Sequence, residues 1–412
     1  MSFNAGGGSS SIASASDVAL SSPADTQVLG YDGTTAKWKN VSLPASSGGW
    51  PGTVALDSFS GANDDAKLEA AFAYVKAQPY MPMILFSNRN YTFTQTHNTF
   101  SGMKLSGFPA GFLNAELASS SYVGTKVTVN CGIDGSSFLV GTAQNYDIYI
   151  GNMAFSSTNQ ATQWISHPLA AGTMYAACFE NLDFMGFKHV MGNPTNPLSI
   201  TLNQWRGAWN ITTTVDTQIT VGGSDSDLFT EGVNIGADAT NWPGAGKPLM
   251  ICNNLGKTNI GPMYFTCDNG WTALSVTGGL TYGPSLHFTG CRFEGRNPST
   301  PSNGAVLLIS GGGVTFRDCW FAYGMANPTA NGHTPTDAGM IMITGGDVVV
   351  DNPTYDRASS VAETVPLLYA TSGTVDISRA RIATRGGSWT GKPRVHADSG
   401  ASLVSDASVT LV

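Results

Sequence analysis

Short runs in which apolar and polar residues alternate cover most of this chain. One eight-residue frame recurs: apolar, any, apolar, any, turn residue, small, any, apolar. It occurs at residues 148–155, 177–184, 286–293, 314–321, 348–355 and 375–382. In the C-terminal half, neighbouring copies begin between 27 residues (348 to 375) and 34 residues (314 to 348) apart. Alternation buries one face of each strand, and a period of this length built from strands and turns is typical of a solenoid.

The repeat predicts an all-β fold, a right-handed parallel β-helix over residues 54–385. A second apolar strand precedes the frame in the later copies, and Ser310, Thr344 and Thr371 mark one repeated corner. A coil buries about five inward side chains at about 1.5 to 3 kcal/mol each, whereas ordering each residue costs about 1 to 2 kcal/mol. No coil is therefore stable alone, and the coils must stack.

A single helix is predicted over residues 64–77, just before the first coils. Leu68, Ala71, Phe72 and Val75 fall at helical spacing on one face, and Asn63 or Asp64 can cap the start. The unpaired edge of a first coil is adhesive, so we expect this helix to cover it.

The first 53 residues form a different kind of segment, rich in Gly and Ser around a compact stretch over residues 17–41. Leu29 and Tyr31, the turn at Asp32 and Gly33, and Trp38 predict a small hairpin. Such a hairpin is too short for its own core, so it needs a partner. The alternative is a leader with a few apolar residues. Residues 386–412 predict a linker and a last strand or two, packed on the lower end or across a trimer axis.

Composition restricts the partners. Charged residues make up 12% of the chain and the net charge is −8, which argues against nucleic acid or an anionic membrane as a partner. No apolar run approaches the length of a membrane span, so we expect no membrane insertion. The 6 cysteines are too few for a disulfide scaffold, and Cys291 and Cys319 share one register position, which favours small core residues.

Candidate chemistry lies at the outward positions of the frame. Glu180 and Asp183 straddle one turn, and two nearby carboxyl groups are what a glycosidase requires. The alternative to a catalytic role is that both side chains are solvated surface carboxylates. Aromatic and cationic side chains near outward positions are candidate ligand-binding residues, namely Trp205, Arg206, Arg292, Arg317 and Trp320.

We expect no cofactor and no metal ion. Asp225, Asp227 and Glu231 are the only clustered carboxylates that suggest calcium, and an acidic loop is the favoured interpretation.

Two stretches resemble known families. Residues 17–41 resemble the DVxLSxPxxxQVLxYDxxxxKWxN segment near the N-termini of tail and fibre proteins of tailed bacteriophages. Residues 57–93 resemble the opening of pectate-lyase-like β-helices, including phage tailspikes, although residues 58–61 and 88–90 depart from the usual spelling.

The resemblance implies a homotrimeric tail-fibre or tailspike-like protein of the phage virion. Leu29, Tyr31 and Trp38 of the N-terminal segment would attach it to tail or baseplate proteins, and the β-helix would bind a host-surface glycan. Two alternatives stay open: a polysaccharide depolymerase, either hydrolase or lyase, on the same β-helix, and a purely structural minor tail component. Release of products from a glycan would indicate the depolymerase. Absence of binding to host cells would indicate the structural tail component.

Overall fold

The computed structural model covers the whole chain and describes most of it. The described residues are 18–19, 27–32, 37–42, 52–108, 124–131, 136–157, 163–212, 216–222, 228–231, 233–236, 248–253, 258–268, 272–278, 286–296, 307–323, 341–357, 368–379, 383–385, 394–405 and 410–411.

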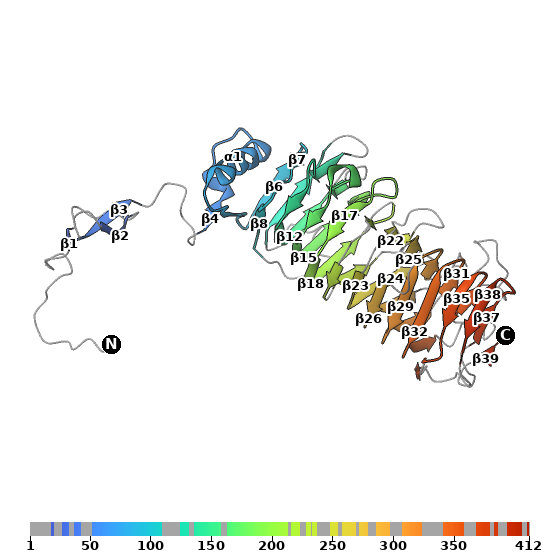
Figure 1. Cartoon of the computed structure of the whole chain (residues 1–412). Helices are drawn as coiled ribbons and strands as arrows, with labels where there is room; N and C mark the ends of the chain where they lie inside the picture. The colour runs from blue at the N-terminus through green and yellow to red at the C-terminus, as the bar shows by residue number, and fades with distance from the viewer. Residues whose placement is uncertain are drawn as a thin grey trace, which may run out of the picture.

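A small three-stranded sheet lies near the N-terminus (Figure 1). Strands β2 (Gln27–Asp32) and β3 (Lys37–Ser42) pair antiparallel, with Tyr31 opposite Trp38, so the predicted hairpin is confirmed. Strand β1 (Val18–Ala19) adds in parallel to β3. In the described part of the chain, this sheet shares no strand pairing with the sheets that follow.

The rest of the described chain winds into a rod of stacked coils (Figure 1). Every strand pairing between coils is parallel, as in Val314 opposite Val348 and Phe293 opposite Phe321, so the predicted parallel β-helix is confirmed. The strands form three sheets, of 15, 15 and 6 strands.

Sheet 1 carries the site described below. Its strands are β4 (Thr53–Ala55), β5 (Met83–Leu85), β6 (Asn90–Phe93), β8 (Lys104–Ser106), β9 (Lys126–Val129), β12 (Tyr149–Ser156), β15 (Cys178–Met185), β18 (Asn203–Thr212), β20 (Leu228–Thr230), β21 (Val233–Gly236), β24 (Met263–Asp268), β27 (Arg292–Arg296), β30 (Trp320–Tyr323), β33 (Thr354–Arg357) and β36 (Ala383–Arg385).

Sheets 2 and 3 form the remaining sides. Sheet 2 contains β7 (His97–Asn98), β10 (Ser137–Val140), β11 (Asn145–Tyr146), β13 (Gln163–Ser166), β14 (Met174–Tyr175), β16 (His189–Met191), β17 (Leu198–Thr201), β19 (Ile219–Gly222), β22 (Pro248–Asn253), β25 (Thr272–Thr277), β28 (Leu307–Ile309), β31 (Ile341–Ile343), β34 (Leu368–Ala370), β37 (Arg394–Ala397) and β39 (Thr410–Leu411). Sheet 3 contains β23 (Thr258–Ile260), β26 (Leu286–Thr289), β29 (Gly313–Arg317), β32 (Asp347–Asp351), β35 (Gly373–Asp376) and β38 (Ala401–Val404).

Inward side chains of the frame stack into columns that fill the rod. The rings of Phe265, Phe293 and Phe321 follow one another with centroids 5.0 Å and 5.5 Å apart. Phe288 and Phe316 form a second stack at 5.2 Å. All five side chains are fully buried. The recurrence of apolar residues at fixed frame positions therefore builds one continuous core along the rod.

Helix α1 (Asp64–Ala77) covers the N-terminal end of the rod, over the predicted range. Its start is capped by Asn63, whose Oδ1 accepts a hydrogen bond from the Ala66 amide at 2.8 Å. Leu68, Phe72 and Val75 are buried beneath it. Short 3₁₀ turns lie at η2 (Leu56–Ser58) and η3 (Leu169–Ala171).

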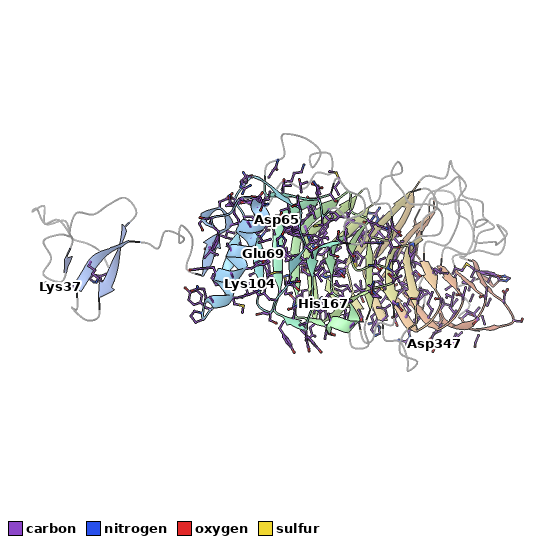
Figure 2. All side chains as sticks on the ribbon, turned by 90° about the horizontal axis from the view of Figure 1, so that it is seen from above. Lys37, Asp65, Glu69, Lys104, His167 and Asp347 are labelled. Carbon is purple, nitrogen blue, oxygen red and sulfur yellow. The ribbon has the colours of Figure 1, made fainter. Side chains whose placement is uncertain are left out.

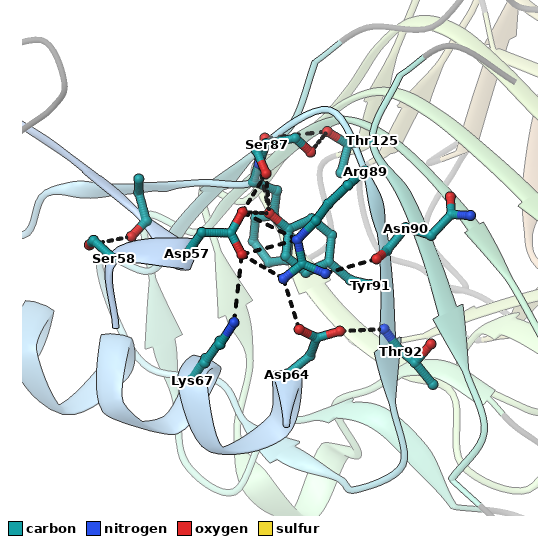
Figure 3. A network of polar contacts seen from close by, with 12 residues as sticks. Asp57, Ser58, Asp64, Lys67, Ser87, Arg89, Asn90, Tyr91, Thr92 and Thr125 are labelled. Carbon is teal, nitrogen blue, oxygen red and sulfur yellow. Dashed lines mark hydrogen bonds and ion pairs between the residues drawn. The ribbon is translucent and has the colours of Figure 1, made fainter. Parts of the chain in front are cut away.

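Polar contacts fasten this cap to the first coils (Figure 3). The Asp57 carboxylate accepts hydrogen bonds from Ser87, from Tyr91 at 2.9 Å and from Arg89 Nε at 3.0 Å. Arg89 Nη2 also reaches Asp64 Oδ1 at 2.9 Å. The guanidinium of Arg89 and the two hydroxyl donors hold the pKa of Asp57 well below its usual range, despite some burial.

A second fastening uses a buried histidine. Asp65 and Glu69 lie on α1 at the capped end of the rod (Figure 2). Between them sits the fully buried ring of His97 on β7, with Nε2 3.0 Å from Asp65 Oδ1 and Nδ1 2.6 Å from Glu69 Oε1. The cap is thus held by charged and hydrogen-bonded groups as well as by apolar packing.

The rod continues past the predicted boundary at residue 385. Strand β37 pairs in parallel with β34, and β38 pairs with β35, within the predicted C-terminal segment. Alternating residues of β38 keep Leu403 against the core while Val404 points out at 47% exposure. The alternation seen in the sequence therefore forms further coil, and contact of this segment with another chain stays a prediction.

The region between residues 200 and 258 contains the two predicted coils. Strands β18 and β21 add to sheet 1, and β19 and β22 add to sheet 2. The register between β15 and β18 shifts by one residue, because Glu180 pairs with Arg206 but Leu182 pairs with Trp209. This bulge inserts one residue and explains why the repeat is hard to follow there. The helices in the described part of the chain are all too short or too polar to cross a membrane.

Candidate functional site

A polar cluster lies on the outer face of sheet 1, in its N-terminal half. Glu180 on β15 accepts a hydrogen bond from the Tyr149 hydroxyl at 3.1 Å. Arg206, one coil further, lies 3.9 Å from Glu180 Oε2 and donates to Cys178 Sγ at 3.2 Å. Burial, together with the charge of Glu180 beside it, raises the pKa of Tyr149 to about 12. Tyr149 is therefore a neutral hydrogen-bond donor at any working pH.

A groove of about 470 Å³ adjoins this cluster. Its lining combines hydrogen-bonding and apolar groups, namely Gln204, Arg206, Phe229, Thr230, Glu231, Gly261 and Pro262. The Phe229 ring is 45% exposed and lies opposite Gln204 in the strand register. The Glu231 amide bonds to the Trp205 carbonyl at 2.8 Å, which places its side chain one coil beyond Arg206. The groove thus offers an aromatic face together with a cation and a carboxylate.

Asp183 lies on the same strand as Glu180 but in a different environment. Asn181, in a left-handed conformation (φ 51°), turns the strand between them, and Asp183 is only 3% exposed. Its Oδ1 atom is buried and has no hydrogen-bond partner among the described residues. Burial raises the pKa of Asp183 to about 7. A carboxyl group with a raised pKa on this face makes Asp183 a candidate functional residue.

A ladder of aromatic and cationic side chains lies further along the same face. Tyr264 on β24, Arg292 on β27 and Trp320 on β30 are in register on three successive coils. The guanidinium carbon of Arg292 sits 3.8 Å from the centroid of the Trp320 ring, a cation–π contact. Tyr264 is 41% exposed. We call these three residues the ladder.

The strand register places Asp183 and the ladder in one column. Asp183 pairs with Asn210, which pairs with Asn234, which pairs with Tyr264 at the start of the ladder. The outer face of sheet 1 therefore carries Glu180 and Asp183 together on β15, and Arg292 and Trp320 four and five coils further along. Arg206 lies beside the groove.

The prediction that Trp205 offers a stacking platform is wrong. Trp205 pairs with Phe179, an inward position of the frame, and its side chain is completely buried. Its ring stacks on Trp209 at 5.5 Å inside the core. Trp205 lies before the bulge in β18 and is adjacent to the outward Arg206, so the alternation of the strand itself points Trp205 inward.

Arg317 lies apart from the other predicted ligand-binding residues. It is on β29 of sheet 3, where its Nε bonds to Asp351 Oδ2 at 3.2 Å. The side chain remains 56% exposed, so the pair is a surface ion pair. Arg292 and Trp320 meet on sheet 1, and Arg317 does not join them.

The remaining candidates are only partly described. Trp38 of the hairpin is 42% exposed, whereas the side chains of Leu29 and Tyr31 lie outside the described part of the chain. Asp225 and Asp227 also lie outside it. Within the residues that the structure does describe, no group of three His, Cys, Asp or Glu side chains is placed to hold a metal ion.

Sequence reasoning missed three residues of this face. Tyr149, Phe229 and Tyr264 were not singled out, although each is outward on sheet 1. Tyr264 sits between the inward residues Met263 and Phe265, so the alternation itself carried the signal. Phe229 is likewise exposed between buried Leu228 and Thr230, so the alternation carried the signal there too.

Comparison with known proteins gives a likeness of fold. No protein-family profile matches the chain, and no curated protein matches it. The structure of DFA-IIIase from Arthrobacter chlorophenolicus A6 in complex with GF2 aligns with a TM-score of 0.53 at 11% identity, over 87% of this chain and 94% of that chain.

Two further structures align less well. ORF18 of Geobacillus virus E2 has a TM-score of 0.43 at 11% identity, over 92% of this chain and 68% of that chain. The A-module of mannuronan C-5 epimerase AlgE4 from Azotobacter vinelandii has a TM-score of 0.41 at 10% identity, over 86% of this chain and 99% of that chain. The likeness to DFA-IIIase shows a shared β-helix fold, and the two weaker alignments carry no argument.

Proposed function

We propose that this chain is a tail-fibre or tailspike-like protein of a tailed bacteriophage that attaches to a glycan on the host surface. In this proposal, the outer face of sheet 1 binds the glycan, and the hairpin with Leu29, Tyr31 and Trp38 fixes the chain to tail or baseplate proteins. Support comes from the tail-protein resemblance of residues 17–41, the β-helix and the chemistry of that face.

One observation carries the proposal, namely the ladder on the outer face of the sheet that also carries the groove. A sugar ring has a face of C–H groups that packs on aromatic rings, and a rim of hydroxyl groups that hydrogen-bond to charged side chains. Tyr264 and Trp320 supply aromatic surface, and Arg292 supplies a cation held between them. Phe229 and Arg206 repeat this combination in the groove.

The test is binding to a panel of host-surface polysaccharides, measured with immobilised glycans. Arg292→Ala should weaken binding about 10-fold, because a partly desolvated cation–π and hydrogen-bonding contact contributes about 1.4 kcal/mol. Arg317→Ala is the matched control, since it removes an exposed arginine from sheet 3. Equal losses in both variants would contradict the assignment of the face. No binding to any glycan or to host cells would favour the structural minor tail component.

A second candidate function, glycan cleavage, is favoured by the state of Asp183. A carboxyl whose pKa lies at about 7 can donate a proton at neutral pH, and Glu180 on the same strand is held by Tyr149. Two carboxyl groups in such different environments are the pattern of an acid and its partner in glycoside hydrolysis.

Cleavage is tested by incubating the protein with a glycan that it binds and measuring new reducing ends or the absorbance of unsaturated uronates. Asp183→Asn and Glu180→Gln should each abolish product while leaving glycan binding measurable. Product that persists in both variants would remove this pair as the catalytic site, and absence of product from the wild type would leave attachment alone.

A further inference from the structure

A buried histidine joins the cap helix α1 to the first coils, and each of its two ring nitrogens faces a carboxyl group. His97 on β7 has no exposed surface. Its Nε2 lies 3.0 Å from Asp65 Oδ1, and its Nδ1 lies 2.6 Å from Glu69 Oε1. Asp65 is buried, whereas the side chain of Glu69 is 56% exposed. We call these three side chains the latch.

The neighbours of Asp65 show which atom carries the proton in the first contact. The amides of Thr94 and Gln95 donate to Asp65 Oδ1 at 3.1 Å and 3.2 Å, and the Thr94 hydroxyl donates to Oδ2 at 2.8 Å. Each of these contacts uses the carboxylate as an acceptor, so His97 Nε2 is the donor in the remaining one. One proton of the ring therefore sits on Nε2.

The second contact then needs one more proton. A neutral imidazole carries a single N–H, so a ring with its proton on Nε2 can only accept a hydrogen bond at Nδ1. An ionised carboxylate also only accepts. Two acceptors 2.6 Å apart repel each other, whereas a proton between His97 Nδ1 and Glu69 Oε1 makes a charge-assisted hydrogen bond. The latch is therefore closed only while it holds this second proton.

The remaining surroundings of the ring are apolar or neutral in the described part of the chain. The rings of Phe72, Phe93 and Phe138 lie around the imidazole, with centroids 6.2, 5.7 and 5.6 Å from its own. The thiol of Cys131 also lies near Asp65, and burial, together with the charge of Asp65, raises the pKa of this thiol to about 11. The thiol is therefore uncharged at neutral pH, and the two carboxyl groups of α1 are the charges that the structure places against the ring.

We infer that the latch is a pH-sensitive fastening of the cap, closed by the proton between His97 and Glu69 and opened as pH rises. An imidazole in water takes up its second proton below about pH 6.5. Below that pH the latch contributes its full stability. Above it, the open latch releases the proton that the closed latch keeps, so each further unit of pH favours the open state by up to about 10-fold. This inference goes beyond glycan attachment and does not depend on it.

The latch is one of two polar fastenings of the cap. Arg89 bonds to Asp57 and to Asp64 at the start of α1, and neither contact depends on the second proton of the latch. An open latch therefore loosens α1 beyond its first turn, where Phe72 and Val75 cover the first coils, while the start of the helix stays attached.

The experiment is hydrogen–deuterium exchange of the full chain, followed by mass spectrometry from about pH 6 to about pH 9. Exchange in α1 is divided by exchange in strands β29 and β32 of the same sample, because the intrinsic rate changes with pH by the same factor in both. In the wild type this ratio should rise with pH, by up to about 10-fold per unit.

Glu69→Gln separates the contact from the second proton. The glutamine amide can donate to Nδ1 of a neutral ring, so the ratio in this variant should stay constant over the same pH range. Glu69→Ala removes the contact, and its ratio should be high at every pH. Both substitutions change a partly exposed side chain, and far-ultraviolet circular dichroism checks that the fold is kept. Glu180→Gln makes the same chemical change on β15 and should keep the wild-type pH dependence.

A wild-type ratio that does not rise with pH would overturn the inference. A ratio in Glu69→Gln that rises as steeply as in the wild type would also overturn it, because the pH dependence would then come from another group. Glycan binding measured on the same samples reports on the proposed function separately, since the ladder and the groove lie on later coils than the latch.

Discussion

Replacement of the buried carboxyl of Asp183 gives the most direct test of the site's electrostatics. In the native protein this side chain is 3% exposed, and its Oδ1 has no hydrogen-bond partner among the described residues. Asp183→Asn keeps the shape of the side chain and removes the ionisable group. The variant therefore isolates what it costs the folded protein to hold a charge at this position.

The magnitude follows from the shift in pKa. Burial raises the pKa of Asp183 from 3.8 to about 7, a shift of about 3 units. Each unit corresponds to about 1.4 kcal/mol, which sets an upper value of about 4 kcal/mol. The folded state binds the proton more tightly than the unfolded state. The stability that protonation of Asp183 contributes is therefore fully present below pH 3.8 and is lost as pH rises through 7. Asp183→Asn should therefore match wild type in acid and be more stable above neutral pH.

The assay is denaturant unfolding of wild type and variant at a series of pH values from acid to above neutral. The difference in unfolding free energy should grow with pH by an amount approaching 4 kcal/mol. Glu180→Gln is the control on the same strand, and its effect should stay below about 1 kcal/mol because its side chain is 32% exposed. A difference between Asp183→Asn and wild type that is constant with pH would refute the reasoning.

Three further predictions concern the core and the cap. Trp205→Ala should lower the unfolding free energy by about 3 to 5 kcal/mol in denaturant titrations, because the ring is completely buried, and a loss below about 1 kcal/mol would indicate a surface position. Arg89→Ala should lower the stability of the protein more at neutral pH than in acid. Arg89 lowers the pKa of Asp57, so the stability from this contact is present above pH 3.8 and is lost as pH falls. Thermal melts at low and neutral pH should therefore differ less in the variant than in wild type. Asn63→Ala should cost about 1 kcal/mol in the same melts, because it removes the helix cap, whereas Asn63→Asp should cost little.

Where the frame is regular, the sequence was enough to predict the structure. Phe288, Phe293, Phe316 and Phe321 are spaced so that only a stacked coil buries all of them, and they do form two columns in the core. The helix at Asp64–Ala77 followed in the same way from its apolar face and its cap. Alternation and spacing are local properties, so they can be read without knowledge of distant contacts.

Where the frame is interrupted, the register is hard to follow. One inserted residue in β18 moves Trp209 into the register position opposite Leu182, and Trp205 falls opposite Phe179. Side chains alternate with a period of two, so a single insertion exchanges the inward and outward sets beyond it. Trp205 and Phe229 both lie before this insertion, where the alternation is regular: Trp205 is next to the outward Arg206, and Phe229 is exposed between buried neighbours. Their misplacement therefore comes from neglect of the alternation and not from the bulge.

The contrast between Glu180 and Asp183 shows what the linear pattern leaves undetermined. Both are outward acidic residues three positions apart, and the sequence treats them alike. In the structure, Asn181 lies between them in a left-handed conformation. Glu180 is partly exposed and accepts a hydrogen bond from the Tyr149 hydroxyl, whereas Asp183 is buried. Desolvation depends on everything that covers a position, which is a property of the folded surface and not of the strand. A pair of carboxyl groups with different proton affinities thus arises from two similar positions in the repeat, and that difference is what makes this face a candidate for chemistry as well as for attachment.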